Sequence, residues 1–290
     1  MTASGRTVSA ILSGARSRFT EAGIADPATD ARLLISGLLG LSSTEMLTRA
    51  NDVPDAEKIC VIEAAIERRL QHEPVHRILG EREFYGLPLM LSAETLEPRP
   101  DTEILVDTML PYLRTLASEG GDLHILDIGT GTGAICLALL SELPQAKGTG
   151  SDISADALQT AAANAKRNGL EGRFQAIQSS WFDNIDGRFH AIVSNPPYIA
   201  SKVIHDLAPE VKKFDPAAAL DGGPDGLDAY RAIAKDAARF LRQNGIIGLE
   251  IGFDQCDDVS DVFEKEGFKR LESVKDYGQN DRVLVFALNV

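Results

Sequence analysis

From His124 onward, apolar runs of strand length alternate with segments whose apolar residues recur at helical spacing. Such alternation favours a mostly parallel sheet with helices on both faces. Two late runs follow each other without a helix between them and predict a final hairpin with an antiparallel last strand. We therefore expect an α/β, doubly wound fold. The predicted strands are 123–127, 147–151, 173–178, 189–194, 245–251, 268–275 and 282–288, and the predicted helices are 133–142, 154–168, 227–242 and 257–266.

The chain before this region has a different pattern, in which helical spacing dominates. Helices are predicted at 8–22, from Pro27 to Gly40, after a capping box that begins at Ser42, and from Pro54 to Leu70. This part shows no recognisable catalytic set, so docking or substrate recognition is its expected role. We predict an N-terminal helical substrate-recognition domain over 1–74, a β-hairpin linker over 75–100 and a catalytic domain over 101–290.

Composition excludes several classes of protein. The 290 residues are 44% hydrophobic and 25% charged, which is ordinary for a globular chain and argues against intrinsic disorder. Three scattered cysteines lack the paired spacing of zinc ribbons, so we expect no metal site and a reducing compartment. The N-terminal stretch lacks the apolar core of a signal peptide, and no run reaches the ~18 apolar residues of a membrane span. We expect a cytoplasmic protein without a membrane partner.

The charge is acidic and uneven. The chain has 29 basic and 43 acidic side chains, a net charge of −14, and most of the excess lies after residue 95. Nucleic-acid binding usually depends on a basic surface, because neutralising phosphates releases counterions. We therefore expect no direct nucleic-acid partner, and we expect a monomer.

A glycine-rich string, Leu126-Asp-Ile-Gly-Thr-Gly-Thr-Gly-Ala-Ile135, joins a predicted strand to a predicted helix. Its glycines allow a tight turn and a close approach of the backbone to a ligand at the positive end of the helix. The string suits either a dinucleotide or S-adenosylmethionine. Asp152, which ends the next strand, would accept both hydroxyls of an adenosine ribose in either case. A packing turn and a helix N-cap at Asp152 are the structural alternatives.

The string Asn195-Pro196-Pro197-Tyr198 directly follows an apolar strand, at the end where doubly wound sheets bind ligands. Prolines donate no N–H, so this stiff backbone offers only carbonyl acceptors. With the Asn195 side-chain oxygen, these acceptors would hold both hydrogens of a planar NH₂ group, and Tyr198 would pack on its face. Such a site orients a weakly nucleophilic nitrogen for attack on a methyl group. A Pro-Pro turn without function is the structural alternative.

The glycine loop, Asp152 and the Asn-Pro-Pro-Tyr string together predict an S-adenosylmethionine-dependent methyltransferase that acts on a planar nitrogen. Hydride transfer to or from a nicotinamide does not require acceptors for an NH₂ group, so the Asn-Pro-Pro-Tyr string argues against a nicotinamide-dependent enzyme. Trp181 follows the third predicted strand, and it would either wall the adenine or serve as a core aromatic.

These strings resemble those of one family, the release factor glutamine methyltransferases of the PrmC/HemK type. The resemblance covers nearly the whole chain, although the first 70 residues are similar only as a helical module. Its family-specific segments are Pro98–Glu103 and Asp221–Asp228, and it implies a Rossmann-like class I S-adenosylmethionine-dependent methyltransferase sheet. The other similar strings are Gly80–Gly86, Asp127–Gly133, Ser194–Ile199, Leu249–Gly252 and Asp281-Arg282.

The resemblance also implies a substrate and roles for residues. The substrate would be the glutamine of the Gly-Gly-Gln motif in class-1 peptide chain release factors, methylated on its side-chain amide nitrogen. Asn195, Pro196 and Tyr198 would be catalytic, with Pro197 also at the substrate, and Arg99 or Glu103 would reach the cofactor. The implied S-adenosylmethionine site consists of Gly129, Thr130, Gly131, Thr132, Gly133, Asp152, Trp181 and Asn195.

Two other functions compete with this interpretation. A nucleic-acid methyltransferase acting on the exocyclic amine of adenine would also use Asn-Pro-Pro-Tyr, but the acidic charge argues against it. A cofactor-binding module without catalysis would have no reason to keep that string. Finally, residues 199–226 form a long segment without a regular pattern, and we predict that it lies over the substrate end of the pocket.

Overall fold

The computed structural model describes residues 6–118, 120 and 122–289, so the first five residues of the predicted helical domain lie outside the described residues. It divides the chain into two compact units. The first runs to Glu81 and includes Ala208–Phe214, and the second comprises Arg82–Leu207 with Asp215–Val290. None of the described helices is both long enough and apolar enough to span a membrane.

The first unit is a helical bundle around a core that includes Phe19, Leu34 and Ile62. The first four of its helices begin where a side chain caps them. The capping box at Ser42 is present, and the Asp55 side chain accepts from the Lys58 backbone N–H. Because of that cap, the fourth helix begins at Ala56 rather than at Pro54. The helices are α1 (Val8–Glu21), α2 (Pro27–Leu39), α3 (Ser43–Thr48), α4 (Ala56–Leu70), α5 (Val75–Leu79) and α9 (Pro209–Phe214).

A hairpin of β1 (Glu81–Phe84) and β2 (Leu87–Met90) leads through a turn, η1 (Pro100–Thr102), into helix α6 (Glu103–Ser118). A seven-stranded sheet follows in the order β5-β4-β3-β6-β7-β9-β8. The pairs from β5 to β7 are parallel, and β9 lies antiparallel between β7 and β8. The strands are β3 (Leu123–Ile128), β4 (Ala146–Asp152), β5 (Phe174–Gln178), β6 (Phe189–Ser194), β7 (Leu241–Glu250), β8 (Phe268–Lys275) and β9 (Asp281–Leu288).

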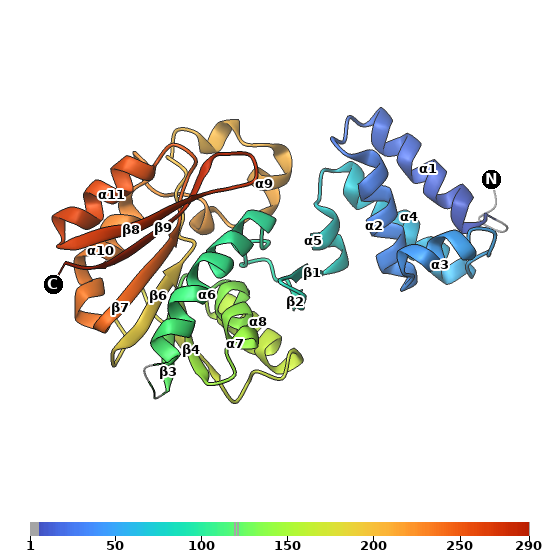
Figure 1. Cartoon of the computed structure of the whole chain (residues 1–290). Coiled ribbons are helices and arrows are strands. Elements are labelled where there is room, and N and C mark those ends of the chain that lie inside the picture. Colours follow the sequence, from blue (N-terminus) through green and yellow to red (C-terminus); the bar gives the residue numbers. More distant parts are fainter. Residues whose placement is uncertain (1–5, 119, 121, 290) are drawn as a thin grey trace. The chain divides into compact units, whose positions relative to one another are not determined.

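Helices cover both faces of this sheet (Figure 1). One core lies beneath α6, α7 (Ala134–Glu142) and α8 (Ala155–Arg167). The opposite core lies beneath α10 (Asp228–Phe240) and α11 (Cys256–Lys265). In α10 the buried residues recur three or four positions apart, as expected for a helix with one face on a sheet. The expected α/β fold with an antiparallel last strand is thus confirmed.

Further features differ from the sequence-based prediction. The pattern did not predict α5, and β7 begins at Leu241 rather than at residue 245. Residues 199–226 contain short helical turns, η2 (Ile204–Asp206), α9 and η3 (Ala217–Ala219), and a bridge between Ile199 and Asp221 closes this segment at its base. Its segment Ala208–Phe214 belongs to the first unit, where Glu210 accepts a hydrogen bond from Arg69 at 3.4 Å.

Candidate active site

One cavity lies at the carboxyl ends of β3, β4 and β6, within the second unit. Because these strands are parallel, the segments that follow them meet at one edge of the sheet. Most of the predicted site residues line this cavity, whereas Gly133 and Tyr198 do not. The predicted residues on its wall are Gly129, Thr130, Gly131, Thr132, Asp152, Trp181, Asn195, Pro196 and Pro197.

The glycine loop is anchored by Asp127, a fully buried carboxylate. Its Oδ2 accepts from the Thr130 hydroxyl at 2.7 Å and from the Cys136 backbone N–H at 3.3 Å. Burial raises the pKa of Asp127 to about 7, and these two hydrogen bonds oppose the rise. Gly129 and Gly131 have φ values of +69° and +53°, with open space where a Cβ would lie. The loop therefore exposes backbone to the cavity, as close contact with a ligand requires.

Asp152 joins the loop to the end of β4. Its Oδ2 accepts from the Gly131 N–H at 2.9 Å and its Oδ1 from the Ser154 N–H at 3.0 Å. The N-cap of α8 is Ser154, so capping does not account for Asp152. Ile153 is 58% exposed and lines the cavity, where it offers an apolar surface. A carboxylate beside an apolar surface and a glycine loop fits an adenosine-containing cofactor.

Trp181 lies on the cavity wall and also packs on the core beneath α10. Its φ of +48° is an unfavourable backbone conformation for a bulky residue. The Ser179 hydroxyl stabilises this turn, since it donates to the Trp181 carbonyl at 3.1 Å and accepts from the Asn184 N–H at 3.0 Å. Trp181 therefore lies on the cavity wall and packs on the core at the same time, and its contact with an adenine stays a prediction.

Asn195 is half-buried at the end of β6, and its Nδ2 donates to Thr102 Oγ1 at 3.3 Å. The backbone that follows Asn195 lies in close contact with the segment Asp221–Asp228. A Cβ on Gly222 would lie 2.8 Å from the Pro197 carbonyl oxygen, so only glycine fits there. The Gln255 side chain donates to the Tyr198 carbonyl at 3.1 Å. These contacts fix the turn that carries the predicted amine acceptors.

Tyr198 itself lies off the cavity wall and packs against the core beneath α10. Burial, followed by the nearby Glu250 carboxylate, raises the pKa of Tyr198, while Arg99 and Arg282 lower it. Its ring thus lies near charged groups, of which Glu250 is buried. Of the two residues that the resemblance linked to the cofactor, Arg99 lines the cavity, whereas Glu103 accepts from the Tyr85 N–H in the hairpin.

Part of the segment 199–226 lines the cavity, namely Pro216, Ala218 and Ala219. Three further residues had no role in the sequence-based prediction: Ile153 and Thr102, which line the cavity, and Glu250, whose carboxylate raises the pKa of Tyr198. Ile153 adjoins Asp152 in sequence, so its position after β4 was a usable signal. Thr102 and Glu250 lie far from Asn195 along the chain, and no local pattern relates them to it. The described residues contain no cluster of His, Cys, Asp or Glu suited to a metal ion.

Comparison with solved structures supports the fold. A methyltransferase from Pyrococcus furiosus superposes with a TM-score of 0.51 at 19% identity, over 70% of this chain and 89% of that one. Residues 97–213 match the methyltransferase small domain, and residues 10–80 match the PrmC N-terminal domain. Together with the cavity, these findings define a class I S-adenosylmethionine-dependent methyltransferase.

Curated relatives identify the family. The release factor glutamine methyltransferase of Agrobacterium fabrum is 60% identical over 97% of this chain and 97% of its own length. That of Rhodospirillum rubrum is 44% identical over 92% of this chain and 81% of its own length. The chain belongs to the release factor glutamine methyltransferase family.

Proposed function

We propose that this protein transfers the methyl group of S-adenosylmethionine to the side-chain amide nitrogen of the glutamine in the Gly-Gly-Gln motif of class-1 peptide chain release factors. The observation that carries the proposal is the position of Asn195, Pro196 and Pro197 on the same cavity wall as the glycine loop and Asp152. The names of the relatives support the choice of substrate.

Each part of the cavity has a role in this reaction. The glycine loop, with Thr130 and Thr132, would hold the methionine part of the cofactor, Asp152 the ribose, and Ile153 and Trp181 the adenine. The cofactor supplies a methyl group on a positively charged sulfur. Asn195 Oδ1 and the Pro196 carbonyl would accept the two hydrogens of the glutamine NH₂. Tyr198 would support this turn from the side of the core and would pack on the amide of the glutamine.

Orientation is the main requirement of this chemistry. The lone pair of an amide nitrogen is delocalised, so the nitrogen is a weak nucleophile. Carbonyl acceptors favour the pyramidal transition state, in which the N–H groups become more acidic. A strong base is not required, because the proton can leave after the methyl group has been transferred.

The helical unit would dock the release factor, in the cytoplasm and with the enzyme as a monomer. An acidic surface suits a protein loop with basic flanks better than it suits nucleic acid.

Label transfer tests the proposal. Tritiated S-adenosylmethionine is incubated with a release factor, with the same factor carrying a substituted glutamine, and with duplex DNA. We expect label only in the unsubstituted factor. Label in the DNA would support the adenine methyltransferase instead, and equal labelling of the substituted factor would refute the choice of glutamine.

A further inference from the structure

Two aromatic side chains of the second unit, Phe253 and Tyr277, are largely exposed to solvent. Phe253 is 65% exposed and lies in the turn after β7. Tyr277 is 93% exposed and lies in the turn between β8 and β9. A single exposed aromatic residue is ordinary on a protein surface, so the place that these two share in the fold carries the argument.

Both turns lie at the edge of the sheet that bears the proposed amine site. Ser194 of β6 pairs with Leu249 of the parallel strand β7. Glu250 of β7 pairs with Val283 of the antiparallel strand β9. The chain therefore leaves β6, leaves β7 and enters β9 at the same edge. The two turns with exposed aromatic residues are thus at the edge where the Asn-Pro-Pro-Tyr turn begins.

The turn that carries Phe253 is hydrogen-bonded to the backbone of the amine site. The buried Gln255 side chain donates through Nε2 to the Tyr198 carbonyl at 3.1 Å and to the Gly226 carbonyl at 3.2 Å. Its Oε1 accepts from the Gly252 N–H at 3.0 Å. Phe253 lies between Gly252 and Gln255, so these contacts hold its backbone while its ring stays exposed.

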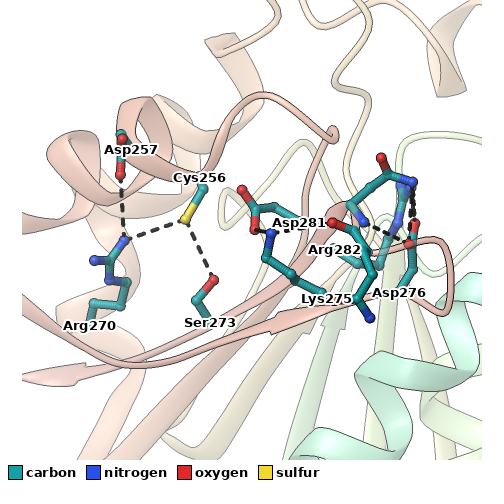
Figure 2. A network of polar contacts seen from close by, with 10 residues as sticks. Cys256, Asp257, Arg270, Ser273, Lys275, Asp276, Asp281 and Arg282 are labelled. Atoms are coloured by element: carbon teal, nitrogen blue, oxygen red, sulfur yellow. Dashed lines mark hydrogen bonds and ion pairs between the residues drawn. The ribbon is translucent and has the colours of Figure 1, made fainter.

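The turn that carries Tyr277 is held by Asp276, which is 5% exposed. The Asp276 carboxylate accepts from the Asn280 N–H at 2.9 Å and from Arg282 Nη2 at 3.0 Å (Figure 2). Arg282 also donates to the Ile251 carbonyl at 3.3 Å and so joins this turn to the residue that follows β7. The two aromatic side chains are therefore presented by turns that are fixed to each other.

Tyr277 also lines an open groove of about 630 Å³ between α6 and β8. A hollow beside an aromatic ring can receive a side chain of a partner, and interface hot spots usually lie in such pockets. Two carboxylates, Asp107 and Glu272, and one ammonium group, that of Lys275, line the groove. Its charge therefore favours a cationic side chain.

Acidic side chains also follow Phe253. Asp254 and Asp258 are exposed, and Asp257 has Arg270 as a partner at 3.9 Å. An exposed aromatic ring with carboxylates beside it suits arginine and lysine, whose charge is attracted by the carboxylates and by the face of the ring. The surface around both rings thus fits a basic partner.

We propose that Phe253 and Tyr277 form a docking surface of the second unit for a basic surface of the release factor, next to the methyl-accepting glutamine. This inference rests on the proposed function, which supplies the protein substrate, and it adds to the docking expected of the helical unit. One glutamine side chain cannot bury the ~800 Å² per partner of a stable complex, so much of the affinity must come from contacts beyond the cavity. Fixed turns at its edge provide them with little loss of freedom.

Phe253→Ala and Tyr277→Ala test the surface without disturbing the core, because both rings are exposed. Loss of an aromatic anchor should raise the KM for the release factor about tenfold in each variant and about a hundredfold in the double variant. The kcat at saturating release factor and the cofactor affinity should stay within about twofold of the wild type. Leu271→Ala, which truncates a 44% exposed apolar side chain in the middle of β8, is the matched control and should change none of these quantities.

Asp254→Lys tests the charge of the surface. It should raise the KM for the release factor about fivefold at low ionic strength and less at high ionic strength, because salt screens exposed charges. Glu264→Lys makes the same change of charge at the other end of α11 and should leave the KM unchanged. An unchanged or lower KM in Asp254→Lys would overturn the choice of a basic partner surface.

Cross-linking provides a measurement independent of turnover. A photoreactive benzoyl-phenylalanine in place of Phe253 or Tyr277 should cross-link to the release factor, whereas the same group in place of Leu271 should not. A wild-type KM in the double variant, equal cross-linking from position 271, or cross-links between two copies of the enzyme would overturn the docking surface. A release factor that the wild-type enzyme does not label would instead refute the proposed function.

Discussion

The cavity has two halves, the glycine loop after β3 and the Asn195 turn after β6, and each is held in place by a different kind of contact. After β3, the glycine loop is fastened by carboxylates that accept hydrogen bonds: Asp127 lies in the same string, and Asp152 ends the neighbouring strand. After β6, the turn that begins at Asn195 is fastened by groups far along the chain, such as Thr102, 93 positions earlier, and Gln255. Carboxylates hold the loop whichever way they turn, whereas the Asn195 amide works in only one of its two orientations. The second half therefore depends more on its surroundings.

Asn195→Ala should have the largest effect on turnover, and it should impair only the second half of the cavity. Loss of one acceptor aimed at the transition state should lower turnover about a thousandfold, or roughly 4 kcal/mol. Cofactor affinity should change less than about twofold. Trp181 is the only tryptophan and lines the cavity, so its fluorescence can report cofactor binding while tritium transfer reports kcat.

Asn289→Ala, at an exposed position of the same unit, is the control for this variant and should behave as the wild type. A parallel loss of cofactor affinity and turnover in Asn195→Ala would assign Asn195 to the cofactor side and remove the distinction between the halves.

The same contrast explains what the sequence could predict. The strands, the glycine loop and the Asn-Pro-Pro-Tyr turn depend on short-range patterns, and the structure has them close to the predicted positions. Thr102 and Glu250 were not predicted, because the contact of Thr102 with Asn195 and the position of Glu250 near Tyr198 depend on the strand order and on the entry of α6. The position of Tyr198 depends on packing against α10, and the helical turns within 199–226 depend on tertiary contacts. None of these is visible in a local pattern.

Asp127→Asn should change how the unfolding free energy depends on pH, because it removes the buried carboxyl group of the first half. The folded-state pKa of Asp127 is about 7, above its ordinary value of 3.8, so the folded state binds this proton more tightly than the unfolded state. Wild-type stability should therefore fall as the pH rises from about 4 to about 7. The asparagine variant lacks this penalty, which amounts to roughly 4 kcal/mol in full and to about 3 kcal/mol between pH 5 and pH 8. Urea unfolding at pH 5 and pH 8 measures it.

In that experiment, the unfolding free energy of Asp127→Asn minus that of the wild type should be larger at pH 8 than at pH 5. Glu250→Gln, whose carboxyl has a pKa of about 6, provides a smaller change of the same sign in the second half. A difference for Asp127→Asn that does not vary with pH would show that Asp127 is not protonated in the folded state near neutral pH.

Asp152→Ala should weaken the binding of the cofactor and leave the binding of the substrate unchanged. Removal of a charged acceptor for two ribose hydroxyls should raise the cofactor dissociation constant about a hundredfold. The KM for the release factor should stay within about twofold. Ser154→Ala is the matched control, because it removes the N-cap of α8 at a cost of about 1 kcal/mol in stability without removing the carboxylate. An equal loss of cofactor affinity in both variants would attribute the effect to α8 instead of Asp152.

Ser194→Ala tests whether the two halves act independently. The buried Ser194 hydroxyl at the end of β6 donates to the Ile128 carbonyl at the end of β3, at 2.6 Å, and so links the two halves directly. Loss of this bond should cost about 1 kcal/mol and lower Tm by about 2–4 °C, with kcat changed less than about twofold. Ser180→Ala, at an exposed position, should change neither quantity. If Ser194→Ala lowers kcat about tenfold at unchanged cofactor affinity, the orientation of the Asn195 turn is set from the glycine loop as well as from Thr102, and the halves are coupled across the sheet.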